Sequence, residues 1–439
     1  CNGPDSYANY WNDWDRAANF EYFNMDKEPM INQEVKIGNF GACSRTKFVK
    51  SIKVNTSKVF GNNKINCPFF PEKPNLKCKS VVLRNSGNDF GRSYLRDAFM
   101  QSLLIDRVDI DHQAYQPSVV FINGNYYGML NIRERSNKDF IYANHGLDED
   151  EFVIIEGSGK SSEDEAYREL IAILESVSVN TDAAFERINE LVDIDETLNY
   201  FMAQIYYANT DWPGGNIKCW RKNDGGKFRY ILYDTDFGYS LYGANYSTNG
   251  FSQASKNSVF AGLMKNDAIK SILANKFVVH LASTFESGRA ISLLEEMADA
   301  IEPEALIYAD YLSKNDKIEQ GWEKDILNME SFAQNRPKNI YGQMSSFFGL
   351  GKQVKVDMSS NIENAKFRLN KEACALDLAS FSDFVNRGVD FETLPVEGYL
   401  FKQWEVISEK KLFGNNEYWN YCDETGVDTT TWKNKSGAS

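Results

Sequence analysis

Hydrophobic positions follow a strand-like period in the first part of the chain. Between Asn32 and Leu83, short β-branched runs such as EVKIGNF, FVKSIKV and KSVVLRN are separated by Gly, Asn or Pro. Such runs, bounded by turn-forming residues, predict strands. From Phe90 to Ile105 the period becomes helical, and the apolar stripe consists of Leu95, Phe99, Leu103 and Leu104. Asn88 and Asp89 stand where they can cap the first turn, so one helix is expected among the strands.

Two further apolar runs, PSVVFING and YYGMLNIRE, are joined by Asn123-Gly124-Asn125. Asn and Gly accept positive φ angles, so this sequence predicts a β-hairpin. After Glu134 helical periodicity predominates. The expected helices cover residues 137–144, 162–177, 182–192 and 195–208, with Ser162 and Glu165 as a capping box for the second. Strands are expected within 217–238, and helical period returns from 256 to about 386.

These changes of period predict an α+β fold in two lobes with a short appendage. The small lobe, about 17–135, is β-rich with one helix, and the large lobe, about 136–385, is mainly helical. Pro395 and Gly398 open a β-like tail within 386–439. That tail resembles the start of a secreted β-sandwich module, so a further module is expected after it.

Composition and charge exclude several classes of function. Lys and Arg number 48 against 62 Asp and Glu, a formal charge of −14, which disfavours nucleic acid as a partner. No apolar run reaches the roughly 18 residues of a membrane span. The three histidines form no HExxH motif, and the seven cysteines form no CxxC motif. High aromatic content and sequons at Asn55, Asn245 and Asn434 favour a secreted or cell-surface protein.

Two acidic segments in the predicted large lobe could carry chemistry. Asp211 and Asn216 lie five residues apart on a turn-rich loop that follows an apolar helix. An Asp there can accept a proton from a hydroxyl, and an Asn amide oxygen can bind a hard cation. Asp234 and Asp236 end the apolar strand FRYILY. If that strand persists, alternation directs both carboxylates to one face, as in many Mg²⁺ or Mn²⁺ sites.

Each segment alone is more often an ordinary turn than a catalytic site. Together they give the order helix, D-x-x-x-x-N loop, hairpin and D-x-D-F-G, after a β-rich lobe with one helix. A protein-kinase fold requires this order, with the base and a metal-binding Asn on one loop and a metal-binding Asp after the next hairpin. The combination therefore favours a kinase-like fold.

The chain resembles the CotH kinase-like proteins, a family related to spore-coat kinases. The matching text is GACSRTKFVKSIKV, VLRNSGNDFGRSYLRDAFMQSL, VVFINGNYYGMLNIRERSNKDF, NTDWPGGN and ILYDTDFG, in family order between about residues 17 and 385. The resemblance implies an atypical, secreted or surface-associated protein kinase whose kinase-like domain occupies residues 1–385. The sequence has no G-x-G-x-x-G loop, as expected for this family.

The resemblance also implies roles for individual residues. Asp211 is expected to be the catalytic-loop aspartate, with Asn216 as a metal ligand. Asp234 is expected to be the main metal-binding aspartate, with Asp236 beside it as a second ligand or a residue that stiffens the turn. The literal D-F-G at 236–238 favours Asp236 instead, but the first Asp of the family's D-x-D is ranked higher.

Four residues are expected to bind the nucleotide. Lys50 would reach the phosphates, unless it is a solvated strand lysine. Asp97 lies where a kinase has the Glu that pairs with that lysine, although the shorter side chain weakens this pairing. Arg84 flanks a turn whose amides could contact phosphate or form a local cap, and Glu134 could contact the nucleotide or only hold the crossing between lobes.

The leading hypothesis is an atypical metal-dependent kinase that uses ATP with Mg²⁺ or Mn²⁺. Its partners would be a secreted or cell-surface protein with Ser or Thr acceptors and, through appended modules, cell-surface polysaccharide. The alternative is a catalytically silent surface or scaffold-associated module that binds protein or polysaccharide. A glycoside hydrolase ranks last, because no carboxylate pair is marked at the required separation.

Overall fold

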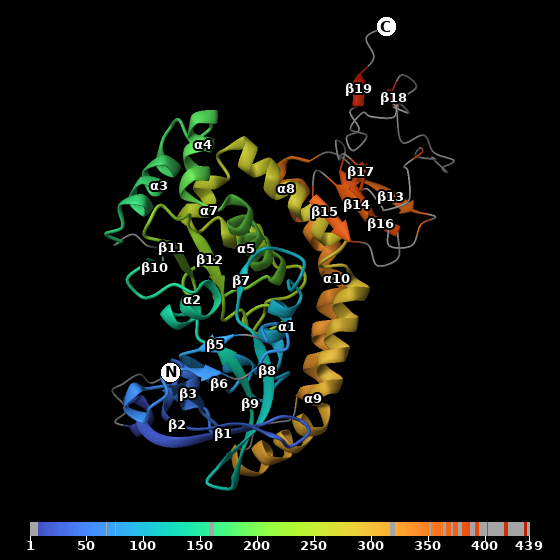
Figure 1. Ribbon diagram of the computed structural model, residues 1–439. Coiled ribbons are helices and arrows are strands. Elements are labelled where there is room, and N and C mark those ends of the chain that lie inside the picture. The colour runs from blue at the N-terminus through green and yellow to red at the C-terminus, as the bar shows by residue number, and fades with distance from the viewer. Residues whose placement is uncertain are drawn as a thin grey trace.

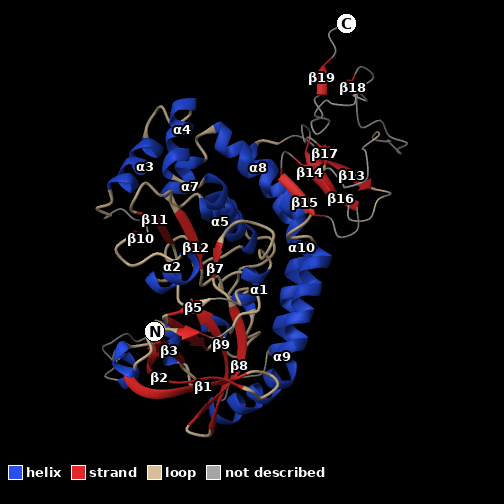
Figure 2. Ribbon diagram, viewed as in Figure 1, coloured by secondary structure: helices blue, strands red, loops and turns tan. Residues whose placement is uncertain are grey.

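The computed structural model describes most of the chain up to residue 350. The described residues are 8–66, 68–74, 76–157, 162–316 and 321–350, then 353–360, 362, 366–369, 372–375, 380–386, 391–394, 402, 417–419 and 434–436. Across these residues, no helix combines the length and apolarity that a bilayer crossing requires. The fold mixes α and β structure, with strands and helices largely segregated (Figure 2).

A six-stranded antiparallel sheet forms the strand-rich part of the molecule (Figure 1). Its order is β1-β2-β3-β6-β9-β8. The strands are β1 (Arg16–Phe23), β2 (Pro29–Phe40), β3 (Ser51–Asn55), β6 (Ser80–Arg84), β8 (Tyr115–Ile122) and β9 (Asn125–Glu134). Minor elements here are η2 (Asn9–Trp11), η3 (Cys43–Thr46), η4 (Lys58–Phe60), η5 (Gly87–Asp89) and the paired strands β4 (Ile65–Asn66) and β5 (Lys77–Cys78).

The hairpin predicted from Asn123-Gly124-Asn125 is confirmed. Ile122 pairs with Asn125, so Asn123 and Gly124 form a two-residue turn. Their φ angles are 51° and 77°. Both are positive, as a twisted two-residue hairpin turn requires, and Asn and Gly adopt such angles at the lowest cost.

The helix predicted among the strands is α1 (Arg96–Ser102), which is shorter than the expected Phe90–Ile105. Residues 90–94 form turns instead. The Asp89 carboxylate accepts the backbone N–H of Arg96 at 3.2 Å, and this contact fixes the start of the helix. The predicted apolar stripe is confirmed as buried, because Leu95, Phe99, Leu103 and Leu104 are at most 1% exposed.

A second sheet, of order β10-β11-β12-β7, lies in the helical part. Its strands are β10 (Phe152–Glu156), β11 (Lys218–Lys222), β12 (Arg229–Leu232) and β7 (Asp111–His112). β7 comes from the chain between α1 and β8 and pairs parallel with β12. The strand-rich segment therefore contributes one strand to the helical part and is joined to it by backbone hydrogen bonds.

The helices after β9 agree with most of the predicted ranges. They are α2 (Lys138–His145), α3 (Glu165–Glu175), α4 (Asp182–Leu191), α5 (Ile194–Tyr207), α6 (Gly250–Ala254), α7 (Ser258–Leu263), α8 (Asp267–Leu281), α9 (Ser287–Asp316) and α10 (Trp322–Phe348). The predicted cap of α3 is wrong. Asp164, not Ser162, accepts the N–H of Tyr167, because the helix begins later than expected.

Helix α9 runs along one side of the molecule and reaches the strand-rich part (Figure 1). The Tyr126 hydroxyl of β9 donates to Glu304 at 2.6 Å. The Tyr308 ring packs against Gly128, where an added Cβ would lie 2.5 Å from the ring. The absence of a side chain at Gly128 therefore allows α9 to pack closely on the sheet.

The helical period expected from 256 to about 386 is wrong beyond residue 350. The described segments there are strands: β13 (Gln353–Ser359), β14 (Lys366–Leu369), β15 (Glu372–Ala375), β16 (Ser380–Asn386), β17 (Phe391–Thr393), β18 (Glu417–Trp419) and β19 (Asn434–Ser436). β13 pairs with β16 over its full length, and β14 pairs with β15 and β17. Val354, Val356 and Met358 alternate with polar residues, a strand period that long-range pairing selects. Most of the predicted further module lies outside the described residues.

Candidate active site

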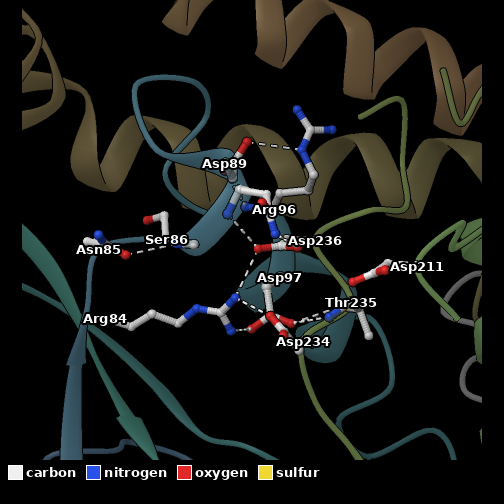
Figure 3. Close-up of polar contacts among 12 residues, drawn as sticks. Arg84, Asn85, Ser86, Asp89, Arg96, Asp97, Asp211, Asp234, Thr235 and Asp236 are labelled. Atoms are coloured by element: carbon white, nitrogen blue, oxygen red, sulfur yellow. Dashed lines mark hydrogen bonds and ion pairs between the residues drawn. The ribbon is translucent and has the colours of Figure 1, made fainter. Parts of the chain in front are cut away.

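Arg84 is the centre of a buried charge cluster (Figure 3). Strand β6 ends at this residue, and its side chain is only 14% exposed. Nη2 donates to Asp234 Oδ1 at 2.5 Å and to Asp236 Oδ2 at 2.9 Å. Nη1 donates to Asp97 Oδ2 at 3.3 Å. One guanidinium thus joins a carboxylate of α1 to the two carboxylates that follow β12.

The charge state of Arg84 follows from these contacts. Burial lowers the pKa of a guanidinium, but the charges of Asp234, Asp97 and Asp236 outweigh it, and the pKa of Arg84 is raised above its usual value. The guanidinium is therefore a permanent cation in a site with little access to solvent.

Asp97 is held as a carboxylate by several donors. Arg133 Nη1 lies 3.0 Å from Asp97 Oδ2. The backbone N–H and the hydroxyl of Thr235 donate to Asp97 Oδ1 at 2.8 and 2.9 Å. Burial alone would raise the pKa of Asp97, but the charges of Arg133 and Arg84, together with the bonds from Thr235, lower it to about 2. Asp97 therefore stays ionised and fixes the segment after β12 to α1.

The two carboxylates after β12 do not meet by strand alternation. The expected continuation of the strand is wrong, because β12 ends at Leu232 and Asp234 has a φ angle of 52°. A turn around the fully buried Thr235 brings both carboxylates to the same guanidinium instead. The expected grouping of Asp234 and Asp236 is therefore present. It results from the turn and from their shared contact with Arg84, not from strand alternation.

Asp234 and Asp236 differ in environment. The Asp234 side chain is 35% exposed, whereas that of Asp236 is 1% exposed. Asp236 Oδ2 accepts the backbone N–H of Asn88 at 2.9 Å, and Oδ1 accepts its side-chain amide at 3.2 Å. Burial and the charge of Asp234 raise the pKa of Asp236 to about 7, against the opposing effect of Arg84. Asp236 is thus bound to the turn after β6, while Asp234 keeps a solvent-facing side.

Gly87, in the turn after β6, was not identified from the sequence. Its φ angle is 61°, and an added Cβ would lie 2.5 Å from Asp236 Oδ2 and 2.6 Å from Arg84 Nη2. A Cβ here would displace the ends of both side chains, so glycine preserves their contact. The N-S-G-N-D sequence was the available signal. Asp89, at the end of this turn, pairs with Arg96 at 3.0 Å, which supports its interpretation as a local cap.

The loop with Asp211 and Asn216 follows α5. Asn216 Nδ2 donates to Asp211 Oδ2 at 3.1 Å, so the two predicted residues meet. Asn209 Oδ1 accepts the backbone N–H of Asp211 at 3.1 Å. The next residue, Trp212, is 1% exposed and donates from its indole to the Tyr200 hydroxyl at 2.9 Å. A buried anchor therefore holds the exposed Asp211.

Asp211 lies within electrostatic range of the charge cluster (Figure 3). Partial burial and the charge of Asp234 raise its pKa, while the hydrogen bond from Asn216 opposes this shift. The backbone N–H of Thr210 donates to the Phe237 carbonyl at 3.4 Å. This bond joins the loop that carries Asp211 to the turn that carries Asp234 and Asp236.

Lys50 is not brought to this cluster. It lies immediately before β3, and its ammonium donates to the carbonyls of Lys47 at 2.8 Å and Phe48 at 3.4 Å. Burial lowers its pKa. Asp97 pairs with Arg84 and Arg133, so the structure does not contain the Lys50–Asp97 pair.

Glu134 is enclosed where the chain leaves β9. Its carboxylate is 2% exposed and accepts from Lys73 at 2.6 Å, from Asn144 at 2.6 Å and from the backbone of Ala114 at 2.9 Å. These partners come from a loop, from α2 and from the segment after β7. The contacts match the second of its two expected roles, holding the crossing between the two parts.

The donor set near Arg84 fits a hard divalent cation. Within the described part of the chain, no three His, Cys, Asp or Glu residues cluster as metal ligands. Mg²⁺, however, commonly uses one or two carboxylates and completes its shell with water and substrate phosphates. Asp234, which keeps a solvent-facing side, and the amide oxygen of Asn216 are oxygen donors of this kind. Cys43, at the start of η3 in the loop between β2 and β3, is disulfide-bonded.

Comparison with known protein families matches most of the chain. The family described as CotH kinase protein matches residues 39–340, which is more than half of the chain. A search of curated proteins finds no match. The matched range contains the loop before β3 and both acidic segments. The chain belongs to the CotH kinase family.

Proposed function

We propose that the protein is an atypical metal-dependent kinase that transfers the γ-phosphoryl group of ATP to a Ser or Thr hydroxyl of a secreted or cell-surface protein. The single observation that carries this proposal is the Arg84 cluster. In it, one strand-end cation contacts both a helix carboxylate, Asp97, and the metal-type Asp234. The same three kinds of group meet in protein kinases, where a strand lysine, a helix glutamate and a metal-binding Asp surround the phosphates.

Arg84, rather than Lys50, is the cation that we assign to the phosphates. Arg84 ends β6, the strand directly before α1, and pairs with Asp97 of that helix. A guanidinium has five N–H donors in a planar fork, so it can bind phosphate oxygens while it keeps Asp97 as a partner. On this proposal the strand-rich part is the small lobe, the helical part is the large lobe, and the nucleotide lies between them.

Asp211 is the proposed base. Its raised pKa favours acceptance of a proton from the attacking hydroxyl. The hydroxyl oxygen forms a bond to the γ-phosphorus, the bond to the β–γ bridging oxygen breaks, and the proton passes to Asp211 as ADP leaves. Arg84 stabilises the charge that develops on the phosphates. A Mg²⁺ or Mn²⁺ ion held by Asp234 and Asn216 would add positive charge there.

The disulfide at Cys43 supports a location outside the cytoplasm, because disulfides persist mainly in oxidising compartments. This agrees with the proposed acceptor, a secreted or surface protein. Polysaccharide at the cell surface is a further proposed partner.

The test is transfer of label from γ-³²P ATP to a Ser-rich acceptor. We compare wild type with Asp211→Asn, which keeps the size of the side chain but cannot accept the proton. The matched control is Asp224→Asn, which removes the same charge from an exposed turn. We expect loss of transfer by at least about 100-fold in Asp211→Asn alone, within the range for a general base. Equal transfer in all three proteins would refute the proposal.

A thermal shift separates the kinase from a silent binding module. A ligand that binds only the native state at 100 times its Kd stabilises it by about 2.7 kcal/mol. We expect a rise in Tm that requires both ATP and the divalent cation. A protein that shows no shift with any nucleotide would instead be the silent module.

A further inference from the structure

Residues 9–15, here called the N-terminal strap, lie on the same face of the six-stranded sheet as Arg84. Gly38 of β2 pairs with Lys53 of β3, and Lys53 pairs with Val82 of β6. Val82 is two residues before Arg84, so alternation directs all these positions to one face. An added Cβ at Gly38 would lie 2.7 Å from the carbonyl oxygen of Trp14 and 3.1 Å from Asp15 Oδ1. The strap therefore crosses this face directly over Gly38.

The strap binds cations of β3 and of the loop between β2 and β3. Asp15 Oδ1 lies 3.1 Å from Lys53 Nζ. Asp13 Oδ1 accepts from Arg45 Nη2 at 3.0 Å, and the Trp11 carbonyl accepts from Arg45 Nη1 at 3.3 Å. Two carboxylates and a carbonyl are thus placed on two cations, as phosphate oxygens would be.

Two further contacts place the strap within this basic surface. Lys50 Nζ lies 5.0 Å from the centre of the Tyr10 ring. Asp15 is also within electrostatic range of Arg135, which follows β9 and lies over the Phe40 ring at 5.7 Å. The strap is therefore the anionic partner of a surface formed by β3, the β2–β3 loop and the end of β9.

The contacts are of a kind that a ligand can replace. The side chains of Asp13 and Asp15 are 76% and 39% exposed, whereas those of Arg45 and Lys53 are only 14% and 17% exposed. Ion pairs of exposed carboxylates contribute little to stability, because water and salt screen them. The carboxylates of the strap are thus the solvent-facing partners, while Arg45 is also held by the Gly41 carbonyl, to which its Nε donates at 2.6 Å.

A nucleotide whose phosphates reach Arg84 must extend its ribose and base along the sheet or away from it. In kinases a loop of the nucleotide-binding lobe covers the phosphates. The β2–β3 loop carries Arg45 and comes before β6 and Arg84 along the chain. A nucleotide that extends along the sheet from Arg84 passes Lys53 and Gly38, where the strap crosses the face.

We propose that Arg45 and Lys53 are nucleotide-binding residues and that Asp13 and Asp15 of the strap compete with the nucleotide for them. This inference rests on the proposed function, because it requires that a nucleotide binds next to Arg84. The strap lowers nucleotide affinity by the free energy of its own contacts, and bound nucleotide displaces it.

The test compares binding of the non-hydrolysable ATP analogue AMP-PNP, with Mg²⁺, by isothermal titration calorimetry. The strap variant is Asp13→Asn with Asp15→Asn. Its matched control is Asp26→Asn with Asp224→Asn, which removes the same charge from two exposed turns. We expect the strap variant to bind about fivefold more tightly than wild type and the control to match wild type. Arg45→Gln and Lys53→Gln should each bind several-fold more weakly.

Hydrogen exchange of residues 9–15 is the second readout, since it reports the strap directly. We expect faster exchange of the strap in wild type when AMP-PNP is added. If wild type binds AMP-PNP but the strap variant binds equally well and strap exchange is unchanged, the strap proposal is wrong and the proposed function stands. If neither protein binds AMP-PNP, both proposals are wrong.

Discussion

Replacement of Asp97 by Asn tests the interpretation of the Arg84 cluster as a set of fixed charges. The change keeps the shape of the side chain and an acceptor for Thr235, but it removes the negative charge that faces Arg84 and Arg133. Arg84 retains Asp234 and Asp236 as partners, whereas Arg133 loses a carboxylate partner. The variant therefore isolates the charge of one buried carboxylate.

The magnitude follows from the pKa of Asp97, which the fold lowers from 3.8 to about 2. A lowering of this size corresponds to about 2 kcal/mol of folding free energy. Because the folded pKa is depressed, this stabilisation is present above pH 4 and is lost as the pH falls through 4 towards 2. We expect Asp97→Asn to lower the free energy of unfolding by about 2 to 4 kcal/mol at pH 7, the upper figure from breaking a buried pair.

Urea unfolding at pH 7, 5, 4 and 3 measures this effect. Tryptophan fluorescence and far-ultraviolet circular dichroism are followed together, because coincident transitions justify a two-state fit. Asp224→Asn serves as the control for loss of a surface charge. The difference between wild type and Asp97→Asn should shrink below pH 4. A difference under about 0.5 kcal/mol at pH 7, or one that stays constant down to pH 3, would refute the charge interpretation.

Three further predictions concern the same cluster. The pKa of Asp236 is raised to about 7, so the folded state binds its proton more tightly than the unfolded state, and stability should fall as the pH rises from 4 to 7. In thermal melts, the fall in Tm between pH 5 and pH 8 should be smaller for Asp236→Asn than for wild type, and equal falls would contradict the assignment. Gly87→Ala should lower stability by more than Gly124→Ala, since both glycines have positive φ but only a Cβ at Gly87 meets Asp236 and Arg84. If urea unfolding shows that both variants lose the same free energy of unfolding, about 1 kcal/mol, the steric effect is excluded. Asp234→Ala should abolish phosphoryl transfer while Asp236→Ala keeps measurable activity, with folding checked by circular dichroism; the reverse order would show that the literal D-F-G was the better guide.

Local chemistry made part of the fold predictable. The hairpin at Asn123 and Gly124 followed from two residues that accept positive φ. The apolar stripe of α1 followed from spacing alone. Its late start did not, because it depends on two bonds from Arg96 to the Asp89 carboxylate, one from the backbone and one from the guanidinium. Residues 353–386 form strands because distant segments pair with one another, and such pairing leaves little mark on a single run of sequence.

The candidate site was predictable where the chemistry is written in short motifs. Asp211 with Asn216 and Asp234 with Asp236 were found in this way, and both groupings are present. Arg84 was singled out, but its central position was not, because three carboxylates reach it from 13 to 152 residues away. The strap was missed for the same reason, since Asp13 and Arg45 are 32 residues apart.

The most direct test of the proposed nucleotide site is a crystal structure with Mn²⁺ and AMP-PNP, in which anomalous scattering locates the metal. We expect Mn²⁺ to be bound by Asp234, with the β- and γ-phosphates in contact with Arg84 and the side chain of Asp211 facing the γ-phosphate. Mn²⁺ ligands should lie at about 2.0 to 2.3 Å, as for other oxygen ligands of small divalent cations. A nucleotide bound away from Arg84, or a metal on Asp236 with Asp234 facing solvent, would contradict the assignment.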